Sequence, residues 1–217
     1  MIQRSLTLAL ILLALGACTQ ERPGMTPPPP NAGEGPAPDT MRWLYASGEA
    51  AAVSIQAWRQ LTDYAIATAA AHPAQSVRMG LPNPTMHDGP GEVGLVPCSG
   101  KPPAVVFDMD ETAVLNSGYE YWQALAKGDQ ANHWGRWAND GAPYVQPVPG
   151  AVDGIRRLRE AGIAVVFNTN RSNESVAGAI AAIKDAGLGT AVHGDALFLR
   201  GDDAMGSRTD GRRAPIA

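Results

Sequence analysis

The chain has 217 residues, of which 45% are hydrophobic and 18% are charged, and its formal net charge at pH 7 is −4. This length and composition can bury one substantial core, so we expect a single domain with appendages. The mildly acidic balance gives no basic footprint for nucleic acid, and we therefore expect no nucleic-acid partner.

The N-terminus has the pattern of an export signal. Arg4 precedes an apolar stretch, residues 6–15, which is too short to span a bilayer and leads into the motif LGAC ending at Cys18. The pattern resembles a bacterial lipoprotein signal, which implies that residues 1–17 are removed and that Cys18 is lipidated. An ordinary signal peptide before a chance cysteine is the alternative. Residues 18–40, rich in Pro and Gly, are expected to form a tether.

Lipidation of Cys18 implies a location and leaves one cysteine. We expect a protein of the bacterial cell envelope, held on the outer membrane by its lipid and facing the periplasm. Cys98 is then the remaining thiol, so no internal disulfide can form. We expect Cys98 to be structural or incidental.

A long helix is expected from about Met41 to Ala71, with Asp39 or Thr40 as its cap. One side of it carries residues at helical spacing, namely Trp43, Leu44, Ser47, Ala50, Ala51, Ile55, Trp58 and Leu61. We expect this face to dock on the rest of the domain, with membrane binding as the alternative. Residues 72–101 contain many Pro and Gly and are expected to form an irregular connector, so residues 41–101 make a helical extension and connector.

The most informative stretch follows this connector. Ala104–Phe107 is a short apolar run, typical of a strand buried on both faces of a parallel sheet, and it ends in Asp108 and Asp110. Ligands of open α/β sheets bind at the carboxyl ends of such strands. We therefore expect both carboxylates to face one crevice, with Met109 packed behind them. Repulsion between them is relieved by a divalent cation or a shared proton.

The segment after this strand is polar and aromatic. It carries Tyr119, Trp122, Trp134 and Trp137 and is expected to form a small cap over the crevice. Its rings either stack on a planar ligand or pack the cap onto the core, and the sequence leaves both interpretations open.

Strand and helix patterns alternate in the second half. A helix from Pro149 to Gly162 precedes a buried strand, Ile163–Asn168, and a helix capped by Ser172 or Asn173 runs to Gly187. A short strand is expected at Ala196–Leu199. This order predicts βαβ units and a parallel sheet, hence an α/β core over residues 102–217.

The polar residues at the two strand ends suit phosphate transfer. Asp108 is placed to attack phosphorus, and Asp110 to protonate the leaving oxygen and later deprotonate water. The next strand end supplies Thr169, Asn170 and Arg171 to hold phosphoryl oxygens. Mg²⁺ between Asp108 and the phosphate would neutralise their repulsion.

These motifs resemble the haloacid dehalogenase superfamily of phosphatases, specifically its class C acid phosphatases, the bacterial lipoprotein acid phosphatases and 5′-nucleotidases. The resemblance runs from the signal through residues 43–50 and the D-x-D-E-T strand to about Arg213. It implies a Rossmann-like sheet in which Asp108 is the nucleophile and Asp110 the acid/base. It also implies that Asp108 and Asp110, the latter through its carbonyl, bind Mg²⁺. Finally, it implies that Thr169 and Tyr119 contact the substrate.

The chain departs from the family pattern in three places. Leu115 stands where the family commonly has Asp, and residues 206–213 resemble the third motif but lack its Lys, for which Arg208 is an imperfect substitute. A fourth motif is not apparent, although residues 201–203 mimic its beginning. We therefore expect the C-terminal part of the core to be missing, with an unusual fourth motif as the alternative; a missing strand would leave an unpaired central edge and an under-liganded magnesium.

The resulting hypothesis is a lipid-anchored, magnesium-dependent phosphomonoesterase acting on small phosphate esters, such as nucleoside monophosphates. Two alternatives stay open. A binding lipoprotein that has lost turnover would hold phosphate or nucleotide without hydrolysis, and a phosphotransferase would share the same core. The sequence does not report the oligomeric state.

Overall fold

The structure, a computed structural model, describes residues 36–77, 95–98, 100–125, 133–203, 212 and 216. The predicted signal segment, Cys18, most of the tether and Arg208 lie outside these ranges. Over the ranges described, every helix is too short or too polar to cross a bilayer.

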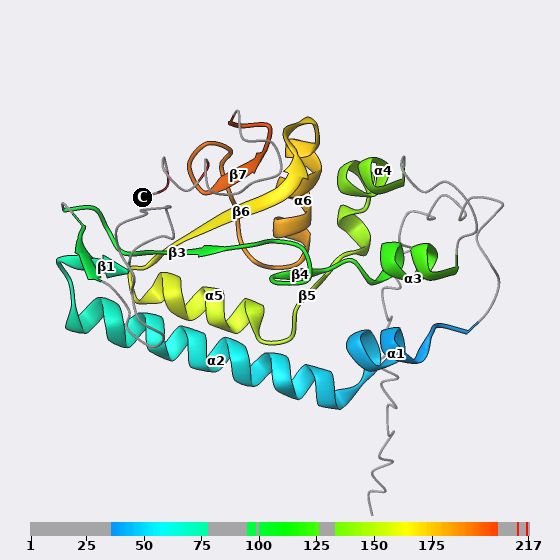
Figure 1. The fold of residues 1–217 in the computed structure, drawn as a ribbon, viewed down its shortest axis with the longest axis horizontal. Coiled ribbons are helices and arrows are strands. Elements are labelled where there is room, and N and C mark those ends of the chain that lie inside the picture. Colours follow the sequence, from blue (N-terminus) through cyan, green and yellow to red (C-terminus); the bar gives the residue numbers. More distant parts are fainter. Residues whose placement is uncertain are drawn as a thin grey trace, which may run out of the picture.

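A parallel sheet lies at the centre of the fold (Figure 1). In the part of the chain described, it consists of β3 (Ala104–Phe107), β6 (Ala164–Ser172) and β7 (Leu197–Arg200), in the order β3-β6-β7. Phe107 pairs with Phe167, which pairs in turn with Leu197. The predicted parallel α/β sheet is confirmed by this pairing. The prediction that β3 is buried on both faces is wrong for the described structure, because Ala104 is exposed and Val105 and Val106 are only partly buried.

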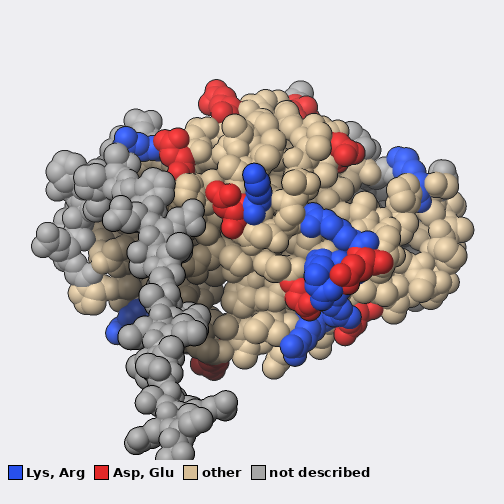
Figure 2. Space-filling view, turned by 180° about the vertical axis from the view of Figure 1, so that it is seen from behind, with Lys and Arg blue, Asp and Glu red and all other residues tan. Residues whose placement is uncertain are grey.

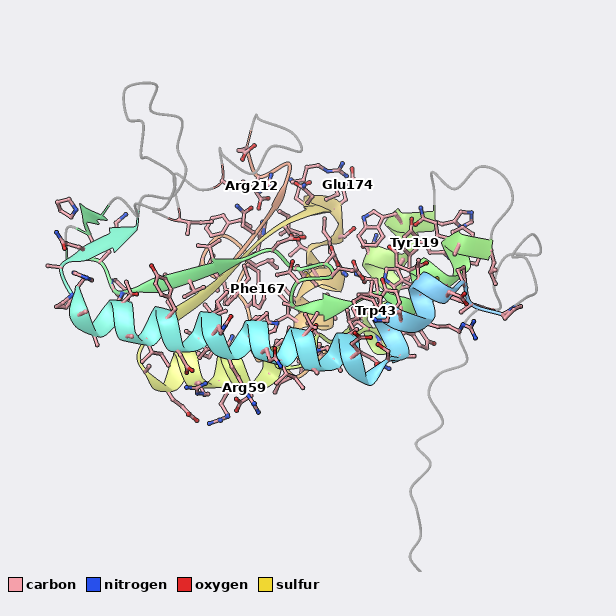
Figure 3. All side chains as sticks on the ribbon, turned by 60° about the horizontal axis from the view of Figure 1, so that its bottom comes forward. Trp43, Arg59, Tyr119, Phe167, Glu174 and Arg212 are labelled. Carbon is pink, nitrogen blue, oxygen red and sulfur yellow. The ribbon has the colours of Figure 1, made fainter. Side chains whose placement is uncertain are left out.

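One face of the sheet builds the hydrophobic core. Phe107 is 4% exposed, and Phe167, Leu197 and Leu199 are fully buried. Helices α5 (Ala151–Glu160) and α6 (Val176–Asp185) complete the same cluster with Ile155, Leu158 and Ile183. Figure 3 shows Phe167 inside this layer. The alternate strand residues, including Val166 and Asn168, face the other side.

The N-terminal extension is two helices, so the prediction of one continuous helix is wrong. Helix α1 (Asp39–Ala46) and helix α2 (Gly48–Ala71) are separated at Ser47. Ser47 has an extended backbone, and its hydroxyl accepts a hydrogen bond from the Ala50 amide at 3.0 Å. It therefore caps α2 instead of continuing a helical face. Pro38, not Asp39 or Thr40, precedes α1.

Helix α2 lies along α5 beneath the sheet in Figure 1, which confirms the predicted docking. Trp58 of α2 contacts Phe107, with ring centroids 4.9 Å apart. Gly154 of α5 makes the approach possible, because a Cβ there would lie 2.7 Å from the Trp58 ring. Figure 2 shows acidic and basic side chains intermingled on the face seen from behind, and one ion pair, Arg157 with Asp63 at 2.6 Å, joins α5 to α2.

The connector is more regular than its Pro and Gly content predicts. Strand β1 (Gln75–Val77) pairs antiparallel with β2 (Leu95–Pro97). Main-chain pairing holds these residues despite the absence of a side-chain period, so the prediction of an entirely irregular connector is wrong.

The segment between β3 and α5, predicted only as a polar, aromatic cap, contains helices and a strand pair. Helices α3 (Ser117–Leu125) and α4 (His133–Asp140) are followed by the short helix η1 (Ala142–Tyr144). Strand β4 (Val114–Leu115) pairs antiparallel with β5 (Gln146–Pro147), which brings the two ends of the segment together. Helix α4 packs on α6, so this segment is fixed to the core.

Two strands differ in extent from their predictions. Strand β6 continues four residues beyond Asn168, because Asn168 and Thr169 pair with Phe198 and Leu199 of β7. Strand β7 begins one residue later than predicted. The Ser172 hydroxyl accepts from the Glu174 amide at 3.3 Å and caps the short helix η2 (Asn173–Ser175), which precedes α6.

Candidate active site

The candidate site lies where β3 ends beside the middle of β6. Because Phe107 pairs with Phe167, the next residues, Asp108 and Asn168, emerge at the same edge of the sheet. Met109 is fully buried in the core, as predicted, while Asp108 and Asp110 both keep part of their surface exposed. The alternation of side chains thus separates one buried residue from two carboxylates.

A tight turn fixes these carboxylates after the strand. The Met109 carbonyl accepts hydrogen bonds from the amides of Ala113 and Val114 at 2.9 and 3.0 Å. The Glu111 amide donates to the Val114 carbonyl at 2.8 Å. Glu111 has a φ of 54°, in the left-handed region that a side chain rarely adopts. Such a backbone persists where its surroundings hold it, which is common at functional sites.

Arg171 binds the second carboxylate. Its Nη2 atom lies 2.7 Å from Asp110 Oδ1, and its Nε atom lies 3.1 Å from both carboxylate oxygens. The Arg171 side chain is 1% exposed. A buried guanidinium needs such a partner, and paired donors give the contact a defined geometry. Arg171, which was predicted to orient phosphate, therefore forms an ion pair with Asp110, the predicted acid/base.

Asn116, which the sequence did not single out, joins this pair. Its Nδ2 atom donates to Asp110 Oδ1 at 2.9 Å, and its Oδ1 atom accepts from Arg171 Nη2 at 3.1 Å. The indole Nε1 atom of Trp137 donates to the same oxygen at 2.8 Å. Asn116 is fully buried. The D-x-D-E-T-x-x-x-N spacing carried no signal for it without knowledge of the turn.

Glu111 connects the turn to the N-terminal helices. Its carboxylate accepts from the Asn116 amide at 2.8 Å and from the Tyr45 hydroxyl of α1 at 3.4 Å. Burial raises the pKa of Glu111, while the hydrogen bonds from Asn116 act in the opposite direction and the charge of Asp110 adds to the rise. Burial, followed by the Glu111 charge, also raises the pKa of Tyr45. Residues of α1 thus lie close to the site.

Asp108 is an exposed residue, yet partial desolvation raises the pKa of its carboxyl group. The nearby Asp110 charge adds to this rise, whereas a hydrogen bond from the Met109 amide and the Arg171 charge oppose it. The Thr112 hydroxyl lies 3.5 Å from Asp108 Oδ2. Positive charge brought to this carboxylate would favour the ionised form that attacks phosphorus.

The end of β6 is held by a second buried arginine. Arg212 is 1% exposed, and its Nε atom donates to Asn168 Oδ1 at 2.7 Å. Its Nη2 atom donates to Asn170 Oδ1 at 3.0 Å and to the Thr169 carbonyl at 3.2 Å. Sequence reasoning considered Arg208 in this segment and missed Arg212. The basic residues within 206–213 were the available signal, but no local pattern shows which of them contacts β6.

The predicted phosphate ligands differ in their surroundings. The Thr169 side chain is fully buried, and its Oγ1 atom accepts from the Arg171 amide at 3.2 Å. The Asn170 side chain contacts Arg212, as described above. Thr169 and Asn170 therefore shape the strand end beside Asp108, and their contact with a phosphate stays a prediction.

Tyr119 lies in a cluster of aromatic rings between α3 and α4 (Figure 3). It meets Trp134 edge to face, with centroids 4.9 Å apart, and lies 6.2 Å from both Trp122 and Trp137. The Arg171 guanidinium lies 5.6 Å from the centre of the Trp134 ring. The rings pack on one another and reach the site through Arg171, so a packing role is observed and a ligand contact stays a prediction.

Comparison with known proteins gives two kinds of match. Residues 46–212 match the family model described as HAD superfamily, subfamily IIIB (Acid phosphatase). No match was found among curated proteins. Among solved structures, the chain is similar to the class C acid phosphatase from Bacillus anthracis with tungstate bound, at 20% identity and a TM-score of 0.57.

A second structure of the class C acid phosphatase from Bacillus anthracis matches at 22% identity and a TM-score of 0.56. Each match covers 81% of this chain and 61% of the other chain. This chain therefore spans less than two thirds of the length of these structures, and at such identities they show a shared fold.

Proposed function

We propose, because the chain belongs to the HAD superfamily, subfamily IIIB (acid phosphatase), that it hydrolyses small phosphate monoesters through a covalent intermediate on Asp108. The observation that carries this proposal is the position of two carboxylates, Asp108 and Asp110, at the carboxyl end of β3 beside the C-terminal half of β6. The Rossmann-like form of the core and the cap function of α3 and α4 are parts of the same proposal.

The chemistry needs two steps. First, an Asp108 oxygen bonds to phosphorus while the bond from phosphorus to the ester oxygen breaks, and the leaving oxygen takes a proton from Asp110. Second, water attacks the phosphorus of the aspartyl phosphate and gives a proton to Asp110, which releases inorganic phosphate and the Asp108 carboxylate. Arg171 lies close enough to Asp110 to stabilise the carboxylate that forms when Asp110 gives its proton to the leaving oxygen in the first step.

The family typically uses a divalent metal, and the residues present fit Mg²⁺. Desolvation and the nearby Asp110 charge raise the pKa of Asp108, so a cation bound there would favour its ionised form. Mg²⁺ takes one or two carboxylates, substrate oxygens and several waters. Asp108 and the Asp110 carbonyl would hold the ion, and it would supply charge that neutralises the phosphoryl oxygens.

Two finer features are also proposals. Nucleoside monophosphates are a suitable substrate class because Tyr119 and Trp134 place aromatic surface near Arg171. Lipidation of Cys18 and an outer-membrane location facing the periplasm are supported by the export-signal pattern at residues 1–18. Palmitate labelling that persists in Cys18→Ser would contradict the lipid anchor.

The direct experiment measures phosphate release from a nucleoside monophosphate with and without Mg²⁺. We expect Asp108→Asn to lower kcat/KM by roughly three orders of magnitude, because the amide cannot act as the nucleophile. Asp153→Asn, on the exposed surface of α5, is the matched control and should keep the wild-type rate. A folded wild-type chain that binds a phosphate analogue but releases no phosphate would instead support the binding-protein alternative.

A further inference from the structure

The Asn116 side chain has one orientation that its neighbours allow. The Trp137 indole and the Arg171 guanidinium are donors only, and both point at Asn116 Oδ1, at 2.8 and 3.1 Å. The amide nitrogen must therefore face the opposite group of acceptors. These are Asp110 Oδ1 at 2.9 Å and the two Glu111 carboxylate oxygens at 3.2 and 3.3 Å.

The main chain of Asn116 is also held by hydrogen bonds. The Asn116 amide donates to Glu111 at 2.8 Å, and its carbonyl accepts from the Glu120 amide at 3.0 Å in the first turn of α3. Asn116 is fully buried, so water does not compete for these contacts.

The result is an asymmetric environment for the Asp110 carboxylate. Its Oδ1 atom accepts from Arg171 Nη2 at 2.7 Å, from Asn116 Nδ2 at 2.9 Å and from Arg171 Nε at 3.1 Å. Within the described residues, Oδ2 accepts only from Arg171 Nε, at 3.1 Å, a donor that it shares with Oδ1. Among the described residues, Oδ2 therefore keeps more of its acceptor positions open to a ligand than Oδ1 does.

We propose that Asn116, oriented by Trp137, is a positioning residue that holds Asp110 Oδ1 and leaves Oδ2 to exchange the proton with the leaving group. The inference rests on the proposed function, because it takes Asp110 as the acid and base. Asn116 touches neither substrate nor phosphate in this scheme. It acts by fixing which Asp110 oxygen is turned toward the reaction.

The test compares two esters that need the acid to different extents. An aliphatic phosphate ester has a poor leaving group that must be protonated, whereas p-nitrophenolate leaves without a proton. The ratio kcat/KM is measured for both, because it reports the step in which the leaving group departs. For Asn116→Asp, which keeps the size and the acceptor but loses the donor, we expect an aliphatic-ester loss of about 10- to 100-fold and a p-nitrophenyl-ester loss below about threefold.

A second variant changes the residue that orients Asn116. Trp137→Phe removes the indole donor to Asn116 Oδ1, and we expect the same preference for p-nitrophenyl phosphate to a smaller degree. Asn139→Ala is the matched control on α4, because the Asn139 amide donates only to the Gly135 carbonyl, at 2.8 Å, among the described contacts. Its ratio of the two rates should equal that of the wild type.

Equal losses of kcat/KM on the two esters in the variants would overturn the inference and leave Asn116 a role in folding alone. Unchanged kcat/KM on both esters would overturn it as well. If Asn116→Asp does not fold, as judged by circular dichroism, the Trp137→Phe ratio decides. Hydrolysis of neither ester by the folded wild type is a different result, because it removes the proposed function and this inference together.

Discussion

Glu120 is a carboxyl group on α3 whose pKa is raised above its ordinary value. Burial is the largest cause of its raised pKa, and the charges of Glu111 and Asp110 add to it. The folded protein therefore binds a proton on Glu120 at pH values where the unfolded chain has lost it. Stability consequently falls as the pH rises from the ordinary value of 4.5 through the raised pKa.

Glu120→Gln removes this cost, so we expect the variant to melt at a higher temperature than the wild type at neutral pH. The difference should shrink as the pH falls and vanish below the ordinary pKa of 4.5. Thermal unfolding followed by circular dichroism across this range measures it. Glu160→Gln, which loses an exposed ion pair with Arg156 at 2.7 Å, should instead lower stability at neutral pH by about 0.5 kcal/mol. A gain that persists at low pH would contradict the assignment.

Some residues of the candidate site can be predicted from their neighbours in sequence, and others depend on distant residues. Asp108 and Asp110 were predicted because they directly follow a short apolar run. Asn116 and Arg212 were missed because their roles depend on partners such as Arg171 and Asn168, 55 and 44 residues away. Polar networks of this kind are set by tertiary packing, to which local spacing gives no access.

Among the elements, the close packing of α4 on α6 depends on one glycine. A Cβ at Gly178 would lie 2.1 Å from the Ala138 carbonyl oxygen and 2.7 Å from the Asn139 Cα atom. Both are main-chain atoms, which cannot rotate away. The two helices therefore approach each other at a distance that only glycine permits.

We expect Gly178→Ala to lower the free energy of unfolding by about 1–3 kcal/mol, because α4 and α6 must separate to admit the methyl group. Urea unfolding monitored by Trp fluorescence measures this loss. Gly135→Ala on α4 is the matched control, since nothing lies within 4 Å of its added Cβ. It should be neutral or stabilise the helix by up to about 1 kcal/mol. Equal effects of the two substitutions would contradict the packing argument.

The boundaries of the elements show what a sequence pattern can and cannot predict. Ala104–Phe107 was predicted as observed, because an apolar run between prolines and carboxylates has clear limits. Strand β6 was predicted too short, because its last residues are polar. Thr169 and Ser172 pair with β7, and Asn170 and Arg171 lie in the register shift between them. Ser47 was assigned to a helical face from its spacing, although its hydroxyl ends that helix and begins another.

At the scale of the molecule, Trp58 is the large buried side chain by which α2 contacts the core. This side chain is 7% exposed, contacts Phe107 and packs closely on Gly154, which has no side chain. Truncating a buried Trp removes apolar contact and leaves a cavity. The residue that Trp58 supports, Phe107, directly precedes Asp108.

We expect Trp58→Ala to lower the free energy of unfolding by about 3–5 kcal/mol. Tyr64→Ala is the matched aromatic control on the same helix, because Tyr64 is 56% exposed. It should change stability by no more than about 0.5 kcal/mol. Chemical unfolding of both variants measures the difference, and a small loss for Trp58→Ala would show that α2 is held by other contacts.

The pairing of β3 with β6 also governs when the site first exists. Asp110 and Arg171 are 61 residues apart, and α3, α4 and α5 are made between them. During synthesis, the carboxylates therefore emerge long before their cation, whereas β6 and β7 close a shorter loop. A nascent chain therefore keeps the two halves of the site apart until the sheet closes, and under the proposed function phosphate release would report the completion of folding.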